Sequence, residues 1–201
     1  MGKCDPSWIN YMSQSVIEAL DSFMQRFKQH AITFPSIATI EYDTKWPSEC
    51  YEPSKDNEEG VMVSWRPVKR WPAAKFGDLE HALDMTLHSD IKDYYGQYWS
   101  ENIYASSEHG PLQLLQAWND EDFTILQQNL VGHILMKRRL RQPETLFFAL
   151  TSEDDFVLSV DNQSGKVMLE QVGLQPQKVI APNLAAFLST ITPSDGPTSE
   201  I

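Results

Sequence analysis

The chain has 201 residues, of which 41% are hydrophobic, and its 28 acidic against 16 basic residues give a formal net charge of -12. This length suits one domain with a sizeable core, and no run approaches the roughly 18 to 20 apolar residues of a membrane-spanning helix. So negative a chain repels phosphate backbones and anionic lipid headgroups, which argues against nucleic acid and direct lipid binding. Because the first residues also lack the apolar segment of a signal peptide, we expect a cytosolic protein.

The first predicted element is an amphipathic helix from about Asp5 to Gln29. Asp5 suits the N-cap and Pro6 the first helical position. Apolar residues recur at helical spacing, at Ile9, Met12, Val16, Leu20, Phe23 and Phe27. Residues 31–60 hold three prolines and an acidic cluster, which predicts a long loop, and residues 61–65 then form a strand.

A second helix is predicted from Gly77 to about Tyr95, with Asp78 as its cap. In one continuous helix, Glu80, Asp84 and His88 would stand one turn apart on the same flank. The pattern therefore indicates a row of two acids and a histidine along this helix.

Residues 102–118 alternate weakly around a glycine, as in a β-hairpin, and Asn119 then caps a third helix. Three acids occupy its first turn and three basic residues close it near residue 139, an arrangement that suits the helix dipole at both ends. On this helix we expect His133 to be a buried, hydrogen-bonded residue.

Three further strands, 146–150, 156–160 and 166–170, are separated by turn sequences and predict an antiparallel meander. A short helix from Pro182 to Ile191 follows, and residues 193–201 read as a disordered tail. The fold class is α+β: a single domain over residues 1–192, with a largely antiparallel (mixed) sheet covered by helices.

The acidity is concentrated in the middle of the chain. Residues 76–136 contain ten acids against the single basic residue Lys92. A negative field of this kind speeds encounters with a cationic partner. Acids in a first helical turn are also explained by the dipole alone, and the two interpretations are compatible.

No catalytic signature is present, and neither Cys4 nor Cys50 belongs to a metal-binding or disulfide motif. One alternative is a hydrolase or metal site formed by His81, Asp84 and His88 on one helical face, but nothing in the sequence supplies a further ligand. We therefore expect no catalytic residue, metal or cofactor.

The segment from Leu114 to Phe123, with Gln127 to His133 and Lys137 to Leu140 after it, closely resembles the signature of the SecY-interacting protein family Syd. Other matching segments cover nearly the whole chain. These segments are Pro47-Ser48-x-Cys50, Val63-x-Trp65-x-Pro67, Glu80-x-Ala82-x-x-Asp84, Pro143-x-Thr145-Leu146-Phe147, Asn162-x-Ser164-Gly165 and Asn183-Leu184-Ala185-x-Phe187-Leu188.

The resemblance implies a SUKH-like fold, shared with toxin-immunity proteins, and a concave acidic surface that binds cytosolic loops of the SecY translocation channel. It implies a non-enzymatic regulator or quality-control factor for uncomplexed or abnormal SecY in SecYEG, held peripherally at the cytoplasmic face of the inner membrane. The alternative is an immunity-type protein that neutralises a basic toxin with the same surface. The candidate partner-binding residues are Glu80, Asp84, Asp120, Glu121 and Asp122, with Asp93 added on charge alone.

Overall fold

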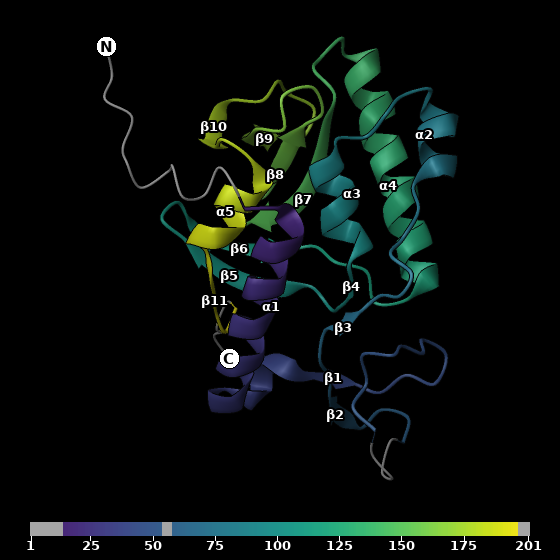
Figure 1. Cartoon of the computed structure of the whole chain (residues 1–201), viewed down its shortest axis with the longest axis vertical. Helices are drawn as coiled ribbons and strands as arrows, with labels where there is room; N and C mark the ends of the chain where they lie inside the picture. The colour runs from purple at the N-terminus through teal and green to yellow at the C-terminus, as the bar shows by residue number, and fades with distance from the viewer. Residues whose placement is uncertain (1–13, 54–57, 197–201) are drawn as a thin grey trace.

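The structure, a computed structural model, describes residues 14–53 and 58–196. Its centre is a seven-stranded antiparallel sheet in the order β10-β9-β8-β7-β6-β5-β11, as Figure 1 shows. The strands are β5 (Ile103–Ser107), β6 (Gly110–Leu114), β7 (Thr145–Thr151), β8 (Phe156–Asp161), β9 (Val167–Gln171), β10 (Lys178–Ala181) and β11 (Thr192–Pro193). The predicted hairpin and meander are thus confirmed, and the α+β class with them.

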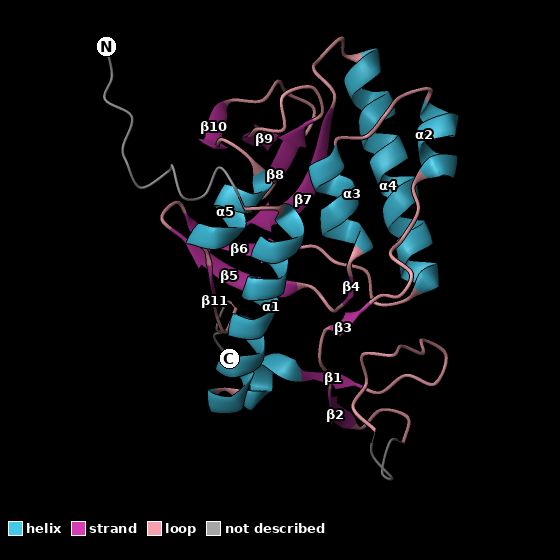
Figure 2. Cartoon of the chain, viewed as in Figure 1, coloured by secondary structure: helices cyan, strands magenta, loops and turns pink. Residues whose placement is uncertain are grey.

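Two short antiparallel pairs flank this sheet. They join β1 (Thr39–Glu41) to β2 (Met62–Ser64) and β3 (Val68–Lys69) to β4 (Tyr98–Trp99). A 3-10 helix (Pro35–Ala38) leads into β1. In Figure 2, β1 and β2 lie at the lower end of the molecule, and β3 and β4 lie above them.

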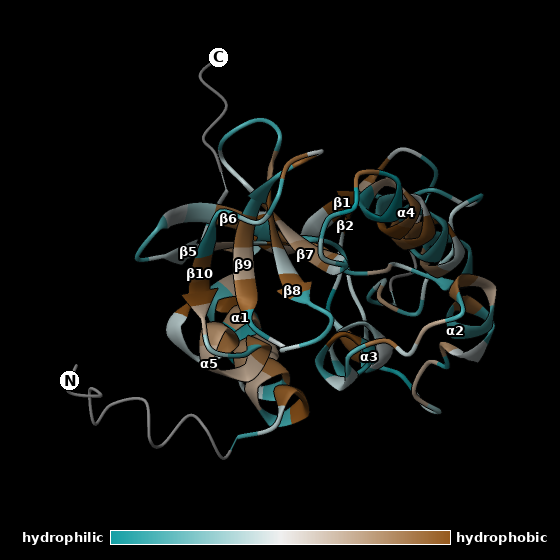
Figure 3. Ribbon diagram, turned by 90° about the horizontal axis from the view of Figure 1, so that it is seen from above, coloured by the Kyte–Doolittle hydropathy of each residue, from teal (hydrophilic) through white to brown (hydrophobic). Residues whose placement is uncertain are grey.

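Five α-helices are found in the described part of the chain: α1 (Val16–Thr33), α2 (Gly77–Leu83), α3 (Ser89–Gly96), α4 (Asp120–Arg139) and α5 (Leu184–Thr190). Figure 3 shows α1 and α5 close together beside the sheet, while α2, α3 and α4 gather beyond β7 and β8. The buried core is continuous between these layers and includes Phe23, Tyr94, Trp118, Phe148 and Leu188. None of the helices in the described ranges is long and apolar enough to span a bilayer.

The first helix begins later than predicted. Ser15 and Glu18 form a capping box, in which the Glu18 N–H donates to Ser15 Oγ at 3.2 Å and the Ser15 N–H donates to Glu18 Oε2 at 3.0 Å. A single helix from Asp5 is therefore wrong, since Ser15 has an extended backbone. The predicted N-cap Asp5 and first helical residue Pro6 lie outside the described residues.

The second predicted helix is two helices. Asp84 ends α2 in the left-handed region, with φ at 47°, and His88 caps α3, its ring accepting from the Asp90 N–H at 3.2 Å. The β8–β9 turn fixes the break, because Asn162 accepts from the His88 N–H at 2.8 Å and donates to the Thr86 carbonyl at 3.0 Å. The predicted row of Glu80, Asp84 and His88 does not exist, nor does the shared face with His81.

The chain after α5 is ordered further than predicted. Pro193 lies in β11, the Ser194 N–H donates to the Tyr104 carbonyl at 3.0 Å, and Asp195 contacts His30 at 2.9 Å. Pro193 and Ser194 therefore extend the edge of the sheet, and Asp195 contacts α1, so this part of the predicted tail packs on the domain. The remainder of the predicted tail, 197–201, lies outside the described residues.

Candidate functional site

The segment between β1 and β2 packs against the beginning of α4. Ser48 Oγ donates to the Trp118 carbonyl at 2.6 Å, and Asn119 Nδ2 donates to the Pro47 carbonyl at 2.9 Å. These two bonds bring Glu49 beside Asp120, although the two acids are far apart in sequence. Both carboxylates line the same surface depressions.

We call this depression the tryptophan groove; it has a volume of about 380 Å³ and is lined by Glu49, Arg70, Trp71, Pro72, Ala73, Ala74, Lys75, Trp99 and Asp120. The Arg70 guanidinium lies 3.5 Å from the centroid of the Trp99 ring, and its Nη2 atom is 3.8 Å from Asp120 Oδ1. Burial lowers the pKa of Arg70, and the charges of Asp120 and Glu49 oppose that shift. The Trp71 side chain stands free at the rim and is 96% exposed.

The segment that brings Glu49 to the tryptophan groove is rich in acids. In the described part of the 41–60 segment, Lys45 is outnumbered by six acids: Glu41, Asp43, Glu49, Glu52, Glu58 and Glu59. This segment lies below the start of α4 in Figure 1. Nearby, burial and the charge of Asp122 raise the pKa of Glu101. The segment that carries Glu49 is therefore acidic, while Arg70 and Lys75 place two positive charges in the tryptophan groove itself.

The three predicted acids at the start of α4 have different environments. Asp120 is 93% exposed at its side chain, and Glu121 is also exposed. Asp122 is half-buried: its Oδ2 accepts from the Trp118 N–H at 2.8 Å, while its own N–H donates to Asn119 Oδ1 at 2.9 Å. Asp122 is thus engaged in capping α4, and Asp120 and Glu121 remain available to a partner.

The other predicted acids lie elsewhere. Arg138 Nη1 donates to the Leu83 carbonyl at 2.7 Å, which ties the end of α2 to the end of α4. Since α4 rises about 27 Å between Asp120 and Arg138, Asp84 is remote from the tryptophan groove. The predicted acids therefore do not form one cluster.

Glu80 and Asp93 are also constrained by their neighbours. Glu80 Oε1 accepts from Lys92 Nζ and from the Leu87 N–H, both at 2.9 Å, and these bonds lower its pKa. Asp93 is half-buried, and burial together with the charge of Asp90 raises its pKa. Neither acid is as open to a partner as Asp120.

The predictions missed Glu49, Trp71 and Trp99 as site residues. The negative charge of residues 41–60 and the exposed basic and aromatic turn at residues 69–72 are visible in the sequence. What brings them together is the pair of hydrogen bonds from Ser48 and Asn119, and these depend on the fold.

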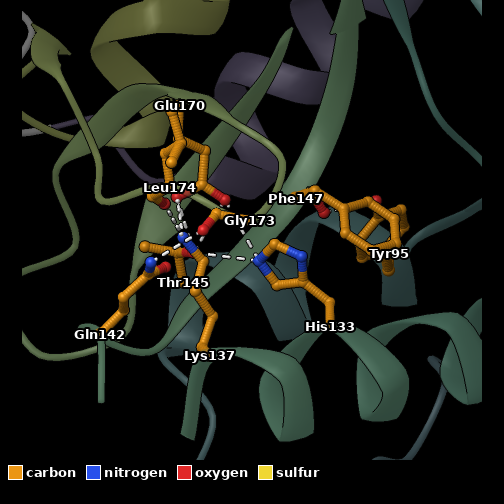
Figure 4. A network of polar contacts seen from close by, with 9 residues as sticks. All are labelled: Tyr95, His133, Lys137, Gln142, Thr145, Phe147, Glu170, Gly173 and Leu174. Atoms are coloured by element: carbon orange, nitrogen blue, oxygen red, sulfur yellow. Dashed lines mark hydrogen bonds and ion pairs between the residues drawn. The ribbon is translucent and has the colours of Figure 1, made fainter. Parts of the chain in front are cut away.

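A second polar cluster, shown in Figure 4, lies between α4 and the sheet. Lys137 Nζ is 2.8 Å from Glu170 Oε2, and both side chains are fully buried. The His133 ring is 3.1 Å from Thr145 Oγ1 and 3.2 Å from Glu170 Oε1, as expected for a buried, hydrogen-bonded histidine. Lys137, predicted to be one of the charges that close the helix, instead faces inward, and the closed cluster holds α4 on the sheet.

This cluster predicts a specific loss of stability in acid. Burial raises the pKa of Glu170, but the hydrogen bonds from His133 and Lys137 outweigh it and hold the pKa below the ordinary 4.5. A depressed carboxylate pKa stabilises the fold above about pH 4.5, and this contribution is lost as the pH falls through the folded-state value. We expect the difference in free energy of unfolding between the wild type and Glu170→Gln to narrow between about pH 6 and pH 3. Urea unfolding across this range measures it, and a constant difference would contradict the assignment.

The described residues contain no group of three His, Cys, Asp or Glu side chains placed to hold a metal ion. Cys50 is buried, and burial raises the pKa of its thiol to about 11. The alternative site of His81, Asp84 and His88 fails on geometry, since the helix that would align them is broken at Asp84.

Fold and surface together define a small α+β protein with a tryptophan-lined groove, in which Glu49 and Asp120 lie with Arg70 and Lys75, beside a curled antiparallel sheet. The family described as Syd protein (SUKH-2) matches residues 17–193. This chain belongs to the Syd family.

Similar proteins share most of their length with it. A Protein Syd of Pseudoalteromonas atlantica is 56% identical over 91% of this chain and 98% of its own length. The Protein Syd of Alteromonas mediterranea is 42% identical over 90% of this chain and 98% of its own. A Shewanella baltica Protein Syd is 40% identical over 91% of this chain and 85% of its own.

Proposed function

We propose that this protein is a non-enzymatic binding protein that docks on the basic cytosolic loops of the SecY channel through the tryptophan groove. The observation that carries the proposal is the convergence of Glu49 and Asp120 beside the exposed ring of Trp71. SecY is the partner implied by the family resemblance. Cytoplasmic loops of membrane proteins are rich in Lys and Arg, so the carboxylates of Glu49 and Asp120 and the acidic segment 41–60 are complementary to them.

The tryptophan groove also offers an aromatic ring face to a cationic side chain. Arg70 already stacks on Trp99 at 3.5 Å, with a carboxylate of Asp120 close by. An arginine or lysine of the partner would find the same combination of ring face and acid at Trp71 and Glu49. Cation–π contacts of this kind contribute about 0.5–1 kcal/mol at exposed sites and more when water is excluded.

In this proposal the protein is held at the cytoplasmic face of the inner membrane by SecY within SecYEG. It would regulate the translocase or recognise uncomplexed or abnormal SecY. Nucleic acid and lipid are unfavourable partners for a chain with a net charge of -12. An immunity role against a basic toxin would use the same charge complementarity, and the identity of the partner distinguishes the two.

The test is binding of synthetic SecY loop peptides to Asp120→Lys and to the matched control Glu108→Lys. Both variants change the net charge equally, but Glu108 lies at the turn between β5 and β6, away from α4 (Figure 1). We expect Asp120→Lys and Trp71→Ala each to weaken binding about tenfold or more, with a steep dependence on salt, and Glu108→Lys to change it little. Binding that ignores salt, or equal losses in both charge variants, would overturn the proposal.

A photo-cross-linker at position 71 of the full chain tests the partner itself. In membranes that contain SecYEG, the cross-linker is expected to capture SecY, and Asp120→Lys is expected to reduce the yield. Efficient capture of a small basic toxin in place of SecY would favour the immunity role.

A further inference from the structure

The outward face of α4 is exposed along its whole length. Six exposed residues lie along the line opposite the buried Leu130: Glu121, Ile125, Gln128, Gly132, Leu135 and Arg139. The two large apolar side chains among them, Ile125 and Leu135, are 42% and 52% exposed. α4 stands at the edge of the molecule, away from α1 and α5, in Figures 1 and 3.

These residues are arranged symmetrically about Leu130. Glu121 and Arg139 are equally distant from it along the helix, as are Ile125 and Leu135, and Gln128 and Gly132. If two α4 helices pack antiparallel about a twofold axis at Leu130, each acid faces an arginine and each isoleucine a leucine. A twofold contact requires this self-complementarity, because one patch meets its own copy.

The rest of the chain does not use this face. Among the described residues, neither Glu121 nor Arg139 has an ion-pair partner, while the neighbouring Arg138 is paired with Glu144 at 2.6 Å. A Cβ at Gly132 would meet nothing within 4 Å. Near the centre of the contact, this glycine lets two helix backbones approach closely, with Gln128 of the other copy lying over it.

We propose that the outward face of α4 binds a second copy of this chain, antiparallel, in a twofold-symmetric dimer. Two Glu121–Arg139 pairs flank the contact, and four apolar side chains lie inside it. One helix pair buries less than the roughly 1,200 Å² of a standard stable interface, so the dimer is weak and depends on concentration. Its charge pairs lie at the rim, where salt screens them.

Sedimentation equilibrium of the purified chain, from about 10 µM to about 1 mM, tests the proposal without any SecY. We expect the wild type to self-associate, and added salt to weaken that association. Glu121→Arg and Arg139→Glu each place like charges opposite one another and are expected to weaken self-association about tenfold or more. The matched control Glu108→Arg alters the charge as Glu121→Arg does and is expected to leave it unchanged.

Restoration provides the decisive comparison. Mixing the Glu121→Arg and Arg139→Glu variants in equal amounts re-forms both charge pairs between unlike chains. The double variant Glu121→Arg/Arg139→Glu re-forms them between identical chains. Both samples are expected to associate as the wild type does. If the two α4 helices packed parallel instead, like charges would meet in the wild type and in the double variant. Added salt would then strengthen self-association. Circular dichroism of each variant checks the fold. A wild type that stays monomeric at about 1 mM, or a double variant that fails to associate although folded, overturns the inference.

Discussion

Replacing Lys137 with methionine is expected to lower the free energy of unfolding by about 3–5 kcal/mol, the cost of removing one partner of a buried ion pair. Lys137 Nζ lies 2.8 Å from Glu170 Oε2 and also donates to the Leu174 carbonyl at 3.0 Å. Without the ammonium group, the buried carboxylate keeps Thr145 and His133 as partners but has lost its compensating charge. Urea unfolding measures the change.

Arg139→Met is the matched control on the same helix. Arg139 is exposed, so its replacement is expected to change stability by no more than about 0.5 kcal/mol. Since an apolar pair can replace a buried ion pair at little cost, Lys137→Met/Glu170→Leu is expected to be less destabilised than the sum of its single variants. Additive losses would show that the two charges are not coupled.

Trp118→Ala is expected to cost about 3–5 kcal/mol and to disturb the tryptophan groove. Trp118 is 2% exposed, and its ring lies edge-on to Tyr51 and Trp65, with centroids 5.0 and 5.9 Å away. Its Nε1–H donates to the Trp46 carbonyl at 3.3 Å, which helps to hold the segment that carries Glu49. Chemical denaturation, followed by loop-peptide binding under conditions where the variant remains folded, measures both effects.

Trp71→Ala distinguishes the proposed binding role of Trp71 from the core-packing role of Trp118. Because Trp71 is 96% exposed, its removal is expected to leave the free energy of unfolding within about 0.5 kcal/mol of the wild type while weakening loop binding. Equal destabilisation by both tryptophan variants would contradict the assignment of Trp118 to the core and Trp71 to the surface.

Local signals predicted several elements correctly. Asn119 caps α4, and the helix ends at Arg139, where Arg138 and Arg139 are exposed basic residues of its last turn. The turns at residues 152–155 and 162–165 separate the strands of the meander as expected. In each case the cause is local, because a cap, a dipole or a tight turn depends on residues within one or two turns of the chain.

The helix predicted from Gly77 to Tyr95 shows where local signals fail. Leu79, Leu83 and Leu87 keep helical spacing, yet the chain leaves the helix at Asp84, a residue type that tolerates the left-handed region. Asn162, far along the sequence, satisfies the backbone groups of the break. The apolar pattern survives because α2 and α3 both face the same core, so periodicity alone cannot distinguish them from one helix.

By itself, the sequence determined the α+β class, the meander, the ends of α4 and a strongly negative chain, because caps, turns and side-chain charges act locally or simply add. Only the tertiary structure decided which acids meet. It joined Glu49 to Asp120, moved Asp84 to the far end of α4, assigned Asp122 to a cap and buried Lys137 against Glu170. These outcomes depend on hydrogen bonds and packing between segments far apart in the chain, which residue type and spacing do not encode.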